Sequence, residues 1–394
     1  MAACWPVLVA VAGGRVDPIR VMVVDDSVVV RRLVTDVLSG DPAIQVVGAA
    51  ANGRLAMGKI DSLAPDLVTM DIEMPEMDGI ETVRAIRAST GASRRVPIIM
   101  FSTLTERGAS ATLDALSAGA NDYVTKPANV GSVAASMESV RQQLIPKIKA
   151  LTGRPTAPAG APAGSRPAAA PAPAARVPVQ ARSGERKKPA VLVIGSSTGG
   201  PEALSKVVPL LPASLPVPVL VVQHMPPVFT TQFAQRLDRL SALQVVEAVA
   251  GTALVPGVVH LAPGDFHLTV SSGRGGRRTA LNQGAPENFC RPAVDVLFRS
   301  AVAAYDGAVL SVVLTGMGSD GRIGTGQVRD AGGTVIAQDQ ATSVVWGMPG
   351  AVTQAGFADE VLPLERIAEA IQRHLPVGRP PLLPPAHTVP GGAR

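Results

Sequence analysis

Two long segments of the chain alternate short apolar runs with stretches in which apolar residues recur every three or four positions. The runs are rich in Val, Ile and Leu, which is typical of strands buried on both faces of a parallel sheet. The stretches between them have the period of helices that cover such a sheet. The pattern therefore predicts two α/β domains, each built on a doubly wound parallel sheet.

The expected strands can be placed by residue number. In the first segment they are residues 19–24, 45–49, 67–70, 97–101 and 122–124. In the second segment they include residues 190–194, 217–222, 258–262, 308–314 and 334–337.

The residues between the two segments differ in composition, being mostly Ala, Pro, Gly and Arg over residues 151–182. Such a stretch buries too little apolar area to offset chain entropy, so we expect a disordered linker. The expected division is an N-terminal extension at 1–17, a first domain at 18–140, the linker at 141–188, a second domain at 189–375 and a disordered Pro-rich tail at 376–394.

The composition of the 394 residues excludes several classes of protein. No apolar run approaches the roughly 18 residues of a membrane span, which excludes an integral membrane protein. Two distant cysteines, Cys4 and Cys290, provide neither a disulfide framework nor a zinc site, so a reducing cytoplasm fits best. The apolar start, Met1 to Ala12, lacks the basic flank of a secretory signal.

The net charge of +5 does not indicate a nucleic-acid-binding protein. The excess of basic residues falls within the linker, whereas phosphate binding needs basic groups clustered on a folded face or in a dedicated arm. A basic tether between two nearly neutral domains is the simpler interpretation.

Polar residues follow the expected strands of the first domain. Asp25 and Asp26 end the first strand, Asp71 the third, Ser102 the fourth, and Lys126 the fifth. Strand C-termini of an open α/β sheet face one crevice, so the three carboxylates should converge. They would repel one another without a cation, and their oxygen ligands suit Mg²⁺. An aspartate in this setting can accept a phosphoryl group with which the lysine pairs.

Four motifs of this domain resemble the receiver domain of two-component response regulators, which has a flavodoxin-like fold. The motifs are Val23-Val24-Asp25-Asp26-Ser27, Met70-Asp71-Ile72-Glu73-Met74-Pro75, Met77-Asp78-Gly79 and Asp122-Tyr123-Val124-Thr125-Lys126-Pro127. The resemblance implies that Asp71 is phosphorylated by a histidine kinase. Its implied Mg²⁺ ligands are Asp25, Asp26, Asp71 and the backbone carbonyl of Glu73. Its implied phosphoryl contacts are Ser102 and Lys126, with Tyr123 as the aromatic residue that reports the switch.

A serine lies in a glycine-rich turn after the first strand of the second domain. Gly195, Ser197 and Gly199 satisfy the pattern G-x-S-x-G, which places a serine hydroxyl on a sharp turn at the top of a sheet. The turn lacks the lysine of a phosphate-binding loop and the spacing of a dinucleotide site. A nucleophilic serine needs a base and a third group that orients the base.

Five histidines are available as that base. His224 follows the strand at 217–222 on the same sheet edge as Ser197 and is the favoured candidate. His267 is the runner-up, and His260 is expected to be a packing residue. The remaining two are His374, which closes the last helix, and His387, which lies in the tail.

The third group of the triad is expected after the strand at 308–314. Asp320 follows this strand in a glycine-rich loop and should converge with Ser197 and His224. The backbone amides near Thr198 and Met317 are candidate donors to an oxyanion.

The second domain also resembles a known family, the catalytic domain of the chemotaxis protein-glutamate methylesterase. The motifs are Gly195-Ser196-Ser197-Thr198-Gly199-Gly200, Gln223-His224-Met225-Pro226, Ala262-Pro263-Gly264-Asp265, Arg291-Pro292-Ala293-Val294-Asp295-Val296-Leu297-Phe298, Thr315-Gly316-Met317-Gly318-Ser319-Asp320-Gly321 and Gly347-Met348-Pro349. The resemblance implies Ser197 as nucleophile, His224 as general base and acid, and Asp320 as its orienter. Cys290 departs from the pattern, because a histidine is expected there.

The two resemblances together imply a hydrolase gated by phosphorylation. It would remove methyl groups from glutamate methyl esters on methyl-accepting chemotaxis receptors, releasing methanol without a metal, and also deamidate receptor glutamines. The unphosphorylated receiver would cover the triad. The alternatives are a receptor-binding protein with a silent triad and an esterase of another signalling pathway. A DNA-binding regulator is not indicated, because the second domain carries no reader motif.

Overall fold

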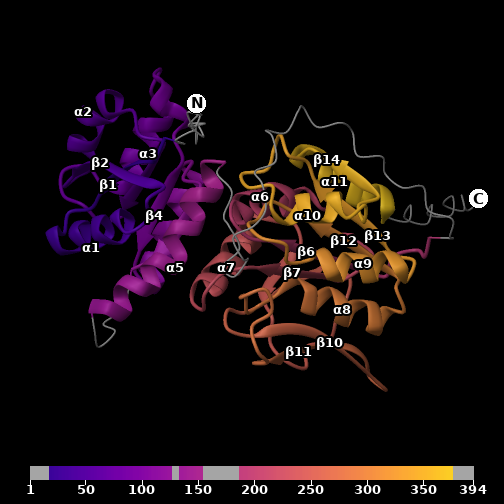
Figure 1. Cartoon of the computed structure of the whole chain (residues 1–394). Helices are drawn as coiled ribbons and strands as arrows, with labels where there is room; N and C mark the ends of the chain where they lie inside the picture. The colour runs from indigo at the N-terminus through magenta and orange to yellow at the C-terminus, as the bar shows by residue number, and fades with distance from the viewer. Residues whose placement is uncertain (1–16, 127–132, 154–185, 376–394) are drawn as a thin grey trace, which may run out of the picture. The chain divides into compact units, whose positions relative to one another are not determined.

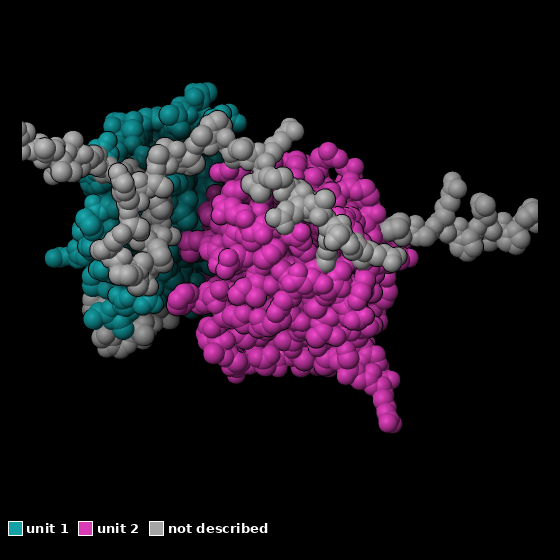
Figure 2. All heavy atoms as spheres, turned by 45° about the vertical axis from the view of Figure 1, so that its right-hand side comes forward, with its two compact units in different colours: residues 1–104, 114–161 teal, residues 105–113, 162–394 magenta. Residues whose placement is uncertain are grey.

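The computed structural model describes residues 17–126, 133–153 and 186–375 (Figure 1). The chain divides into two compact units, residues 1–104 with 114–161 and residues 105–113 with 162–394 (Figure 2). The predicted extension at 1–17, apart from its last residue, and the predicted tail at 376–394 lie outside the described residues.

The first domain contains a five-stranded sheet with the order β2-β1-β3-β4-β5, in which every pair of neighbours is parallel. The strands are β1 (Ile19–Val24), β2 (Ile44–Ala50), β3 (Leu67–Asp71), β4 (Ile98–Ser102) and β5 (Asp122–Thr125). The helices are α1 (Val28–Ser39), α2 (Gly53–Leu63), α3 (Gly79–Ala88), α4 (Glu106–Ser117) and α5 (Val133–Leu151), with a 3-10 turn η1 (Ala92–Arg95). This is the predicted flavodoxin-like order, whose crevice lies at the strand C-termini beside β1 and β3.

Both predicted ends of the linker are wrong. Helix α5 runs on to Leu151, because Val140, Leu144 and Ile148 recur every four residues and are fully buried in the core of the first domain. At the other end, Arg186 pairs with Asp359 at 3.0 Å, so the second domain begins before residue 189. Residues 154–185 between these points are not described.

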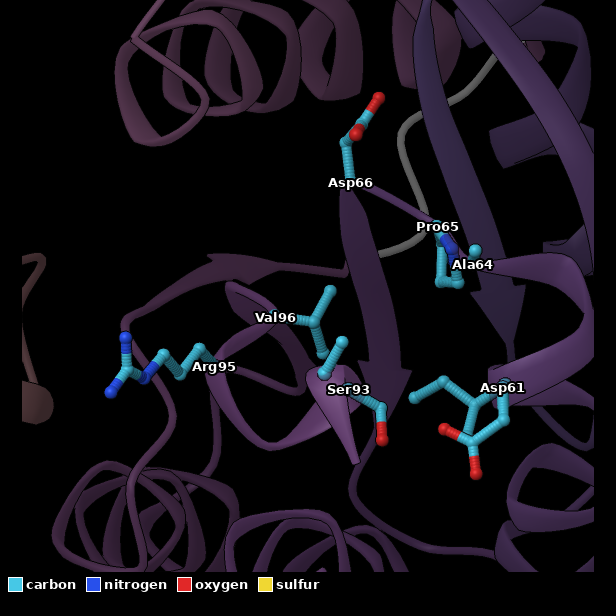
Figure 3. A pocket seen from close by; sticks show the side chains of 9 residues that line it. Asp61, Ala64, Pro65, Asp66, Ser93, Arg95 and Val96 are labelled. Carbon is cyan, nitrogen blue, oxygen red and sulfur yellow. The ribbon is translucent and has the colours of Figure 1, made fainter. Parts of the chain in front are cut away.

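An open cavity of about 350 Å³ lies at the opposite end of the first sheet (Figure 3). Its lining comes from the end of α2, η1 and the residues that precede β3 and β4, and includes Asp61, Asp66 and Arg95. The cavity is therefore remote from the strand C-termini at which the acidic residues gather.

The second domain contains a seven-stranded parallel sheet with the order β14-β13-β12-β6-β7-β9-β8. Its strands are β6 (Val191–Ser196), β7 (Val219–Gln223), β8 (Gln244–Glu247), β9 (Val258–Leu261), β12 (Val309–Val313), β13 (Thr334–Gln338) and β14 (Glu360–Leu362). An antiparallel hairpin is formed by β10 (His267–Gly273) and β11 (Gly276–Asn282). The order reverses between β6 and β12, and ligands of such sheets bind at this switch point.

Helices cover the second sheet and fix the loops at its edge. They are α6 (Gly200–Val207), α7 (Phe229–Leu240), α8 (Val294–Tyr305), α9 (Arg322–Asp330), α10 (Met348–Gln354) and α11 (Leu364–His374), with a 3-10 turn η2 (Val208–Leu210). Helix α8 packs against α9 and the hairpin strand β10, and its Leu297 and Phe298 are fully buried in the core. This packing holds the start of α8 at the C-terminal ends of β6 and β12. Within the described ranges, no helix is long and apolar enough to cross a membrane.

Candidate functional sites

Three carboxylates meet at the C-terminal ends of β1 and β3. Oxygens of Asp25, Asp26 and Asp71 all lie within 4.8 Å of one another. Asp25 and Asp71 are buried, whereas Asp26 is exposed. The structure thus brings together the three side chains that the sequence predicts as metal ligands.

Lys126, which follows β5, is the cation of this cluster. Its Nζ lies 2.7 Å from Oδ1 of Asp71 and 3.3 Å from Oδ2 of Asp25. The latter oxygen is buried and, apart from this ion pair, has no hydrogen-bond partner in the described part of the chain. One ammonium group among three carboxylates leaves a negative balance, and a buried carboxylate oxygen whose one contact is a long ion pair suits a hard cation. The residues therefore fit Mg²⁺.

The pKa of Asp71 reflects the burial of this cluster. Burial raises the pKa of Asp71 to about 6, and the neighbouring charge of Asp25 adds to the rise. The contact with Lys126 and the hydrogen bond from the Ile72 amide, at 2.7 Å, offset only part of it. Burial also raises the pKa of Asp25. Both carboxylates would gain from an additional positive charge.

The other predicted receiver residues lie at different depths. Ser102 ends β4, on the same sheet edge as Asp71, and is buried. Glu73 is exposed in the loop after β3. Tyr123 is buried in β5, where the Nζ of Lys147 lies 5.2 Å from the centre of its ring, and burial raises the pKa of the phenol well above its usual value. The phenol is thus neutral and packed inside the domain.

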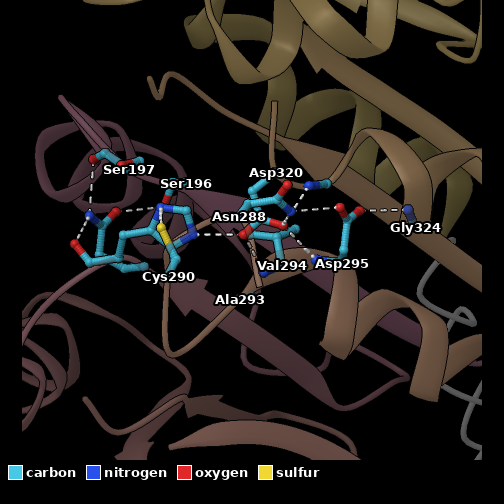
Figure 4. A network of polar contacts seen from close by, with 12 residues as sticks. Ser196, Ser197, Asn288, Cys290, Ala293, Val294, Asp295, Asp320 and Gly324 are labelled. Atoms are coloured by element: carbon cyan, nitrogen blue, oxygen red, sulfur yellow. Dashed lines mark hydrogen bonds and ion pairs between the residues drawn. The ribbon is translucent and has the colours of Figure 1, made fainter. Parts of the chain in front are cut away.

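An acid–base pair lies at the switch point of the second sheet (Figure 4). Nε2 of His224, after β7, is 2.8 Å from Oδ2 of Asp320, after β12. Ser197 follows β6, which lies between these two strands, and is half-buried. Its hydroxyl has no hydrogen-bond partner among the described residues. The structure therefore joins the predicted base and acid and places the predicted nucleophile on the same edge.

The backbone of Ser197 is held from both neighbouring strands. Its amide donates to the carbonyl of Thr315 at 3.0 Å, and its carbonyl accepts from Nε2 of Gln223 at 2.9 Å. The buried Gln223 also accepts a hydrogen bond from Oγ of Ser196 at 2.7 Å. Ser196 is thus occupied away from the acid–base pair, and the position of Ser197 is fixed.

Gly316 allows the loop after β12 to approach the nucleophile. A Cβ added at Gly316 would lie 2.9 Å from Cβ of Ser197 and 2.3 Å from Sδ of Met348, so no larger residue fits there. Met317, the next residue, is half-buried, and Thr198 is buried. These are the residues whose amides the sequence predicts as oxyanion donors, and the close approach of Gly316 is consistent with that position.

Asp320 is surrounded by hydrogen-bond donors. The first amides of α8 donate to it, Val294 at 2.7 Å and Asp295 at 3.0 Å, and the amide of Gly321 donates at 2.9 Å. Burial acts to raise the pKa of Asp320, but the contact with His224 and these amides outweigh it and hold the pKa below its usual value. The acid of the pair therefore stays ionised.

Sequence reasoning missed one side chain that supports this acid. Nδ2 of Asn288 lies 3.0 Å from Oδ1 of Asp320 and 3.0 Å from Oδ2 of Asp295 (Figure 4). Asp295 in turn accepts from the amide of Gly324 at 2.6 Å, and burial raises its pKa to about 6. No motif pointed to Asn288, because it lies in a turn away from every strand end.

The second nitrogen of His224 contacts Cys290. Nδ1 lies 3.4 Å from Sγ of Cys290, which is partly exposed. Burial lowers the pKa of His224, but the charges and hydrogen bonds of Cys290 and Asp320 outweigh it and raise the pKa to about 10. The residue that departs from the family pattern thus touches the predicted base.

The other described histidines do not join this site. His267 is buried and its nitrogens bond to backbone groups, the Ala285 carbonyl at 3.0 Å and the Ala293 amide at 3.2 Å. His260 is buried in β9, and neither of its nitrogens has a hydrogen-bond partner in the described part of the chain. His374 pairs with Glu360 at 2.7 Å. His267 is therefore a structural residue, and the runner-up prediction for the base is not supported.

Two family models match the chain. The model described as response regulator receiver domain matches residues 21–138, and the model described as CheB methylesterase matches residues 192–371. Together they cover the two domains described above.

Proteins named protein-glutamate methylesterase/protein-glutamine glutaminase are similar over most of the chain. One from Nocardioides sp. is 61% identical, with 93% of this chain and 98% of that protein covered. One from Trichodesmium erythraeum is 47% identical, with 90% and 99% covered. Among solved structures, the CheB methylesterase catalytic domain of Thermotoga maritima is 46% identical, covers 47% of this chain and 98% of that one, and has a TM-score of 0.46.

Proposed function

We propose a function for this chain as a member of the protein-glutamate methylesterase/protein-glutamine glutaminase family, to which it belongs by 61% identity across 93% of its length. The chain is an ester hydrolase with an N-terminal receiver domain. Its proposed substrates are glutamate methyl esters on methyl-accepting chemotaxis receptors, from which it releases methanol. Receptor glutamines, which release ammonia, are its proposed second substrates.

The proposed reaction proceeds through an acyl-enzyme. Ser197 Oγ attacks the side-chain carbonyl, and His224 takes the hydroxyl proton and returns it to the methoxide that leaves. A water molecule, activated by the same histidine, then hydrolyses the acyl-serine to glutamate. The amides of Thr198 and Met317 are the proposed donors to the oxyanion.

The observation that carries this proposal is the His224–Asp320 pair beside Ser197. Four N–H groups fix Asp320, from Val294, Asp295, Gly321 and Asn288. An ionised acid held this firmly orients the imidazole and stabilises the imidazolium that forms when serine is deprotonated. A binding surface with no chemistry to perform does not require such an arrangement.

The proposed control lies in the receiver domain. Asp71 accepts a phosphoryl group from a histidine kinase, and Lys126 and Ser102 contact it. Mg²⁺ held by Asp25, Asp26, Asp71 and the Glu73 carbonyl would neutralise the phosphoryl charge. Phosphorylation of Asp71 changes the charge of this buried cluster. This change is proposed to shift the receiver, including Tyr123, to a state that increases esterase activity.

The test is methanol release from methylated receptor by the intact chain. Ser197→Ala should abolish methanol release. Ser196→Ala should retain most of it, because the Ser196 hydroxyl faces Gln223. Ammonia release from receptors with glutamine at the same positions measures the second activity. Methanol release that survives Ser197→Ala, or that is lost equally in both variants, would contradict the assignment of the nucleophile.

A further inference from the structure

The protonation of His224 follows from its partners. The carboxylate of Asp320 can only accept hydrogen bonds, so the nitrogen facing it, Nε2, carries a proton. In the neutral imidazole the remaining nitrogen, Nδ1, therefore holds the basic lone pair. Nδ1, the nitrogen that must take the serine proton, faces Sγ of Cys290 at 3.4 Å, and the Ser197 hydroxyl forms no hydrogen bond with the ring among the described residues.

Cys290 is held in this position by its turn. Backbone hydrogen bonds join Glu287 and Cys290 in both directions, at 3.1 and 2.9 Å, and the residues between them, Asn288 and Phe289, have φ of 53° and 62°. The carboxylate of Glu287 also forms two 2.8 Å contacts with Arg299 of α8. Left-handed backbone at two consecutive non-glycine residues persists only where the surroundings impose it. The thiol is therefore fixed against the base.

We propose that Cys290 is a positioning residue that occupies the base nitrogen of His224 in the resting site, so that Ser197 gains its base only when the Sγ–Nδ1 contact opens. This inference rests on the proposed function, because it concerns the same base. The thiol acts through the imidazole by donating its hydrogen to Nδ1 or by passing the proton to it, which leaves a thiolate beside an imidazolium.

The charged groups around His224 set the expected pH dependence. Asp320 faces it from the loop after β12 and Cys290 from the turn before α8. Asp295 and Glu287 lie behind them, bonded to Asn288 and Arg299. A neutral His224 is needed to take the serine proton, so activity rises as pH rises through the pKa of His224. The thiol is one of the groups that raise this pKa. Its removal should therefore shift the pH at which activity rises to a lower value.

The experiment compares the intact chain with Cys290→Ala, Cys290→Ser and, as a matched control, Cys4→Ala. With methylated receptor, Cys290→Ala should raise kcat about 2- to 10-fold, the effect of one competing hydrogen bond, with little change in KM. The acidic limb of the pH–activity profile of Cys290→Ala should move to lower pH by about one unit. Cys290→Ser, which keeps a hydrogen-bond donor, should return kcat toward the wild-type value.

A second readout does not depend on the substrate. The His224 side-chain nitrogens, followed by NMR against pH in the intact chain, should show a lower pKa in Cys290→Ala than in wild type or Cys4→Ala. An unchanged His224 titration, or an unchanged pH profile with unaltered kcat, overturns the proposal while leaving the esterase assignment intact. Loss of activity in Cys290→Ala with retention in Ser197→Ala would also overturn it, because Cys290 would then be the nucleophile.

Discussion

The two sheets present their buried carboxylates in opposite states. Asp71 is held by the Ile72 amide and Lys126, its pKa is raised to about 6, and among the described residues an oxygen of the neighbouring Asp25 has only a 3.3 Å ion pair with Lys126. Asp320 accepts hydrogen bonds from four N–H groups, besides its contact with His224, and its pKa is lowered. Both lie at the C-terminal ends of parallel strands. The C-terminal edge of the first sheet thus carries a charge cluster that suits an incoming cation and phosphoryl group. The corresponding edge of the second sheet carries a fully hydrogen-bonded acid that orients a base.

Replacing Asp320, the fully hydrogen-bonded acid, should have the largest effect on the rate of methanol release. Asp320→Asn would place an amide N–H opposite Nε2, which favours the tautomer with hydrogen on Nδ1 and no basic lone pair there. We expect kcat for methanol release to fall about 10³- to 10⁴-fold with KM little changed.

The matched control is Asp306→Asn, at a fully exposed carboxylate in the same domain that pairs with Lys187. It should keep kcat within about 2-fold of wild type. A fall of less than 10-fold in Asp320→Asn would mean that the acid–base pair is not used in the reaction.

Removing one donor from Asp320 should have a smaller effect. Asn288→Gly deletes the amide that joins Asp320 to Asp295 while keeping the left-handed backbone, φ 53°, available. A hydrogen bond to a charged group is worth about 1.5–3 kcal/mol, so kcat should fall about 10- to 100-fold.

Asn288→Ala separates the two effects of this position. It lacks the same amide but also strains the backbone, so it should match Asn288→Gly in kcat and have a lower melting temperature. If Asn288→Gly keeps the wild-type kcat, then the three backbone donors hold Asp320 without the side chain.

Neutralising Asp71, the buried carboxylate whose pKa is raised, should increase stability. The folded pKa of Asp71, about 6, lies above its usual value, so its ionisation destabilises the folded state progressively as pH rises through this range. In buffer without Mg²⁺, Asp71→Asn should therefore stabilise the first domain by about 1–3 kcal/mol at neutral pH. The gain should shrink to less than about 1 kcal/mol at pH 4, where the folded-state carboxyl is protonated and the unfolded-state one, of usual pKa 3.8, is partly so.

Thermal unfolding of the intact chain at the two pH values measures this difference. Asp61→Asn provides the control, since that exposed aspartate lies at the cavity on the opposite end of the same sheet (Figure 3). It should change stability by less than about 0.5 kcal/mol at either pH. A destabilised Asp71→Asn would show that the Lys126 contact outweighs the burial of the charge.

The sequence predicted the fold and the placement of the site residues where local pattern determines them. Buried parallel strands produce uninterrupted apolar runs, and the residue after each run lies at the functional edge. Asp71 ends β3, Ser197 and His224 come directly after β6 and β7, and Asp320 lies in the loop after β12. Resemblance to known motifs supplied their chemical roles, which the pattern alone does not provide.

Features that depend on tertiary contacts were not predictable in this way. Asn288 and Cys290 lie in a turn, and Cys290 reaches His224 across a sequence separation of 66 residues. The end of α5 was missed because the apolar period of Leu144 and Ile148 continues into a region read as linker. His267 looked available in sequence, yet backbone groups occupy both of its nitrogens.

Phosphorylation of the acidic cluster of the receiver is proposed to control the acid–base pair of the esterase. The most direct test is the rate of methanol release from methylated receptor, with and without a small-molecule phosphodonor and Mg²⁺, for the intact chain and for Asp71→Asn. We expect that the phosphodonor accelerates the wild type, that this acceleration requires Mg²⁺, and that Asp71→Asn keeps only the unstimulated rate. Equal stimulation of both proteins, or none of the wild type although Asp71 becomes phosphorylated, would contradict it.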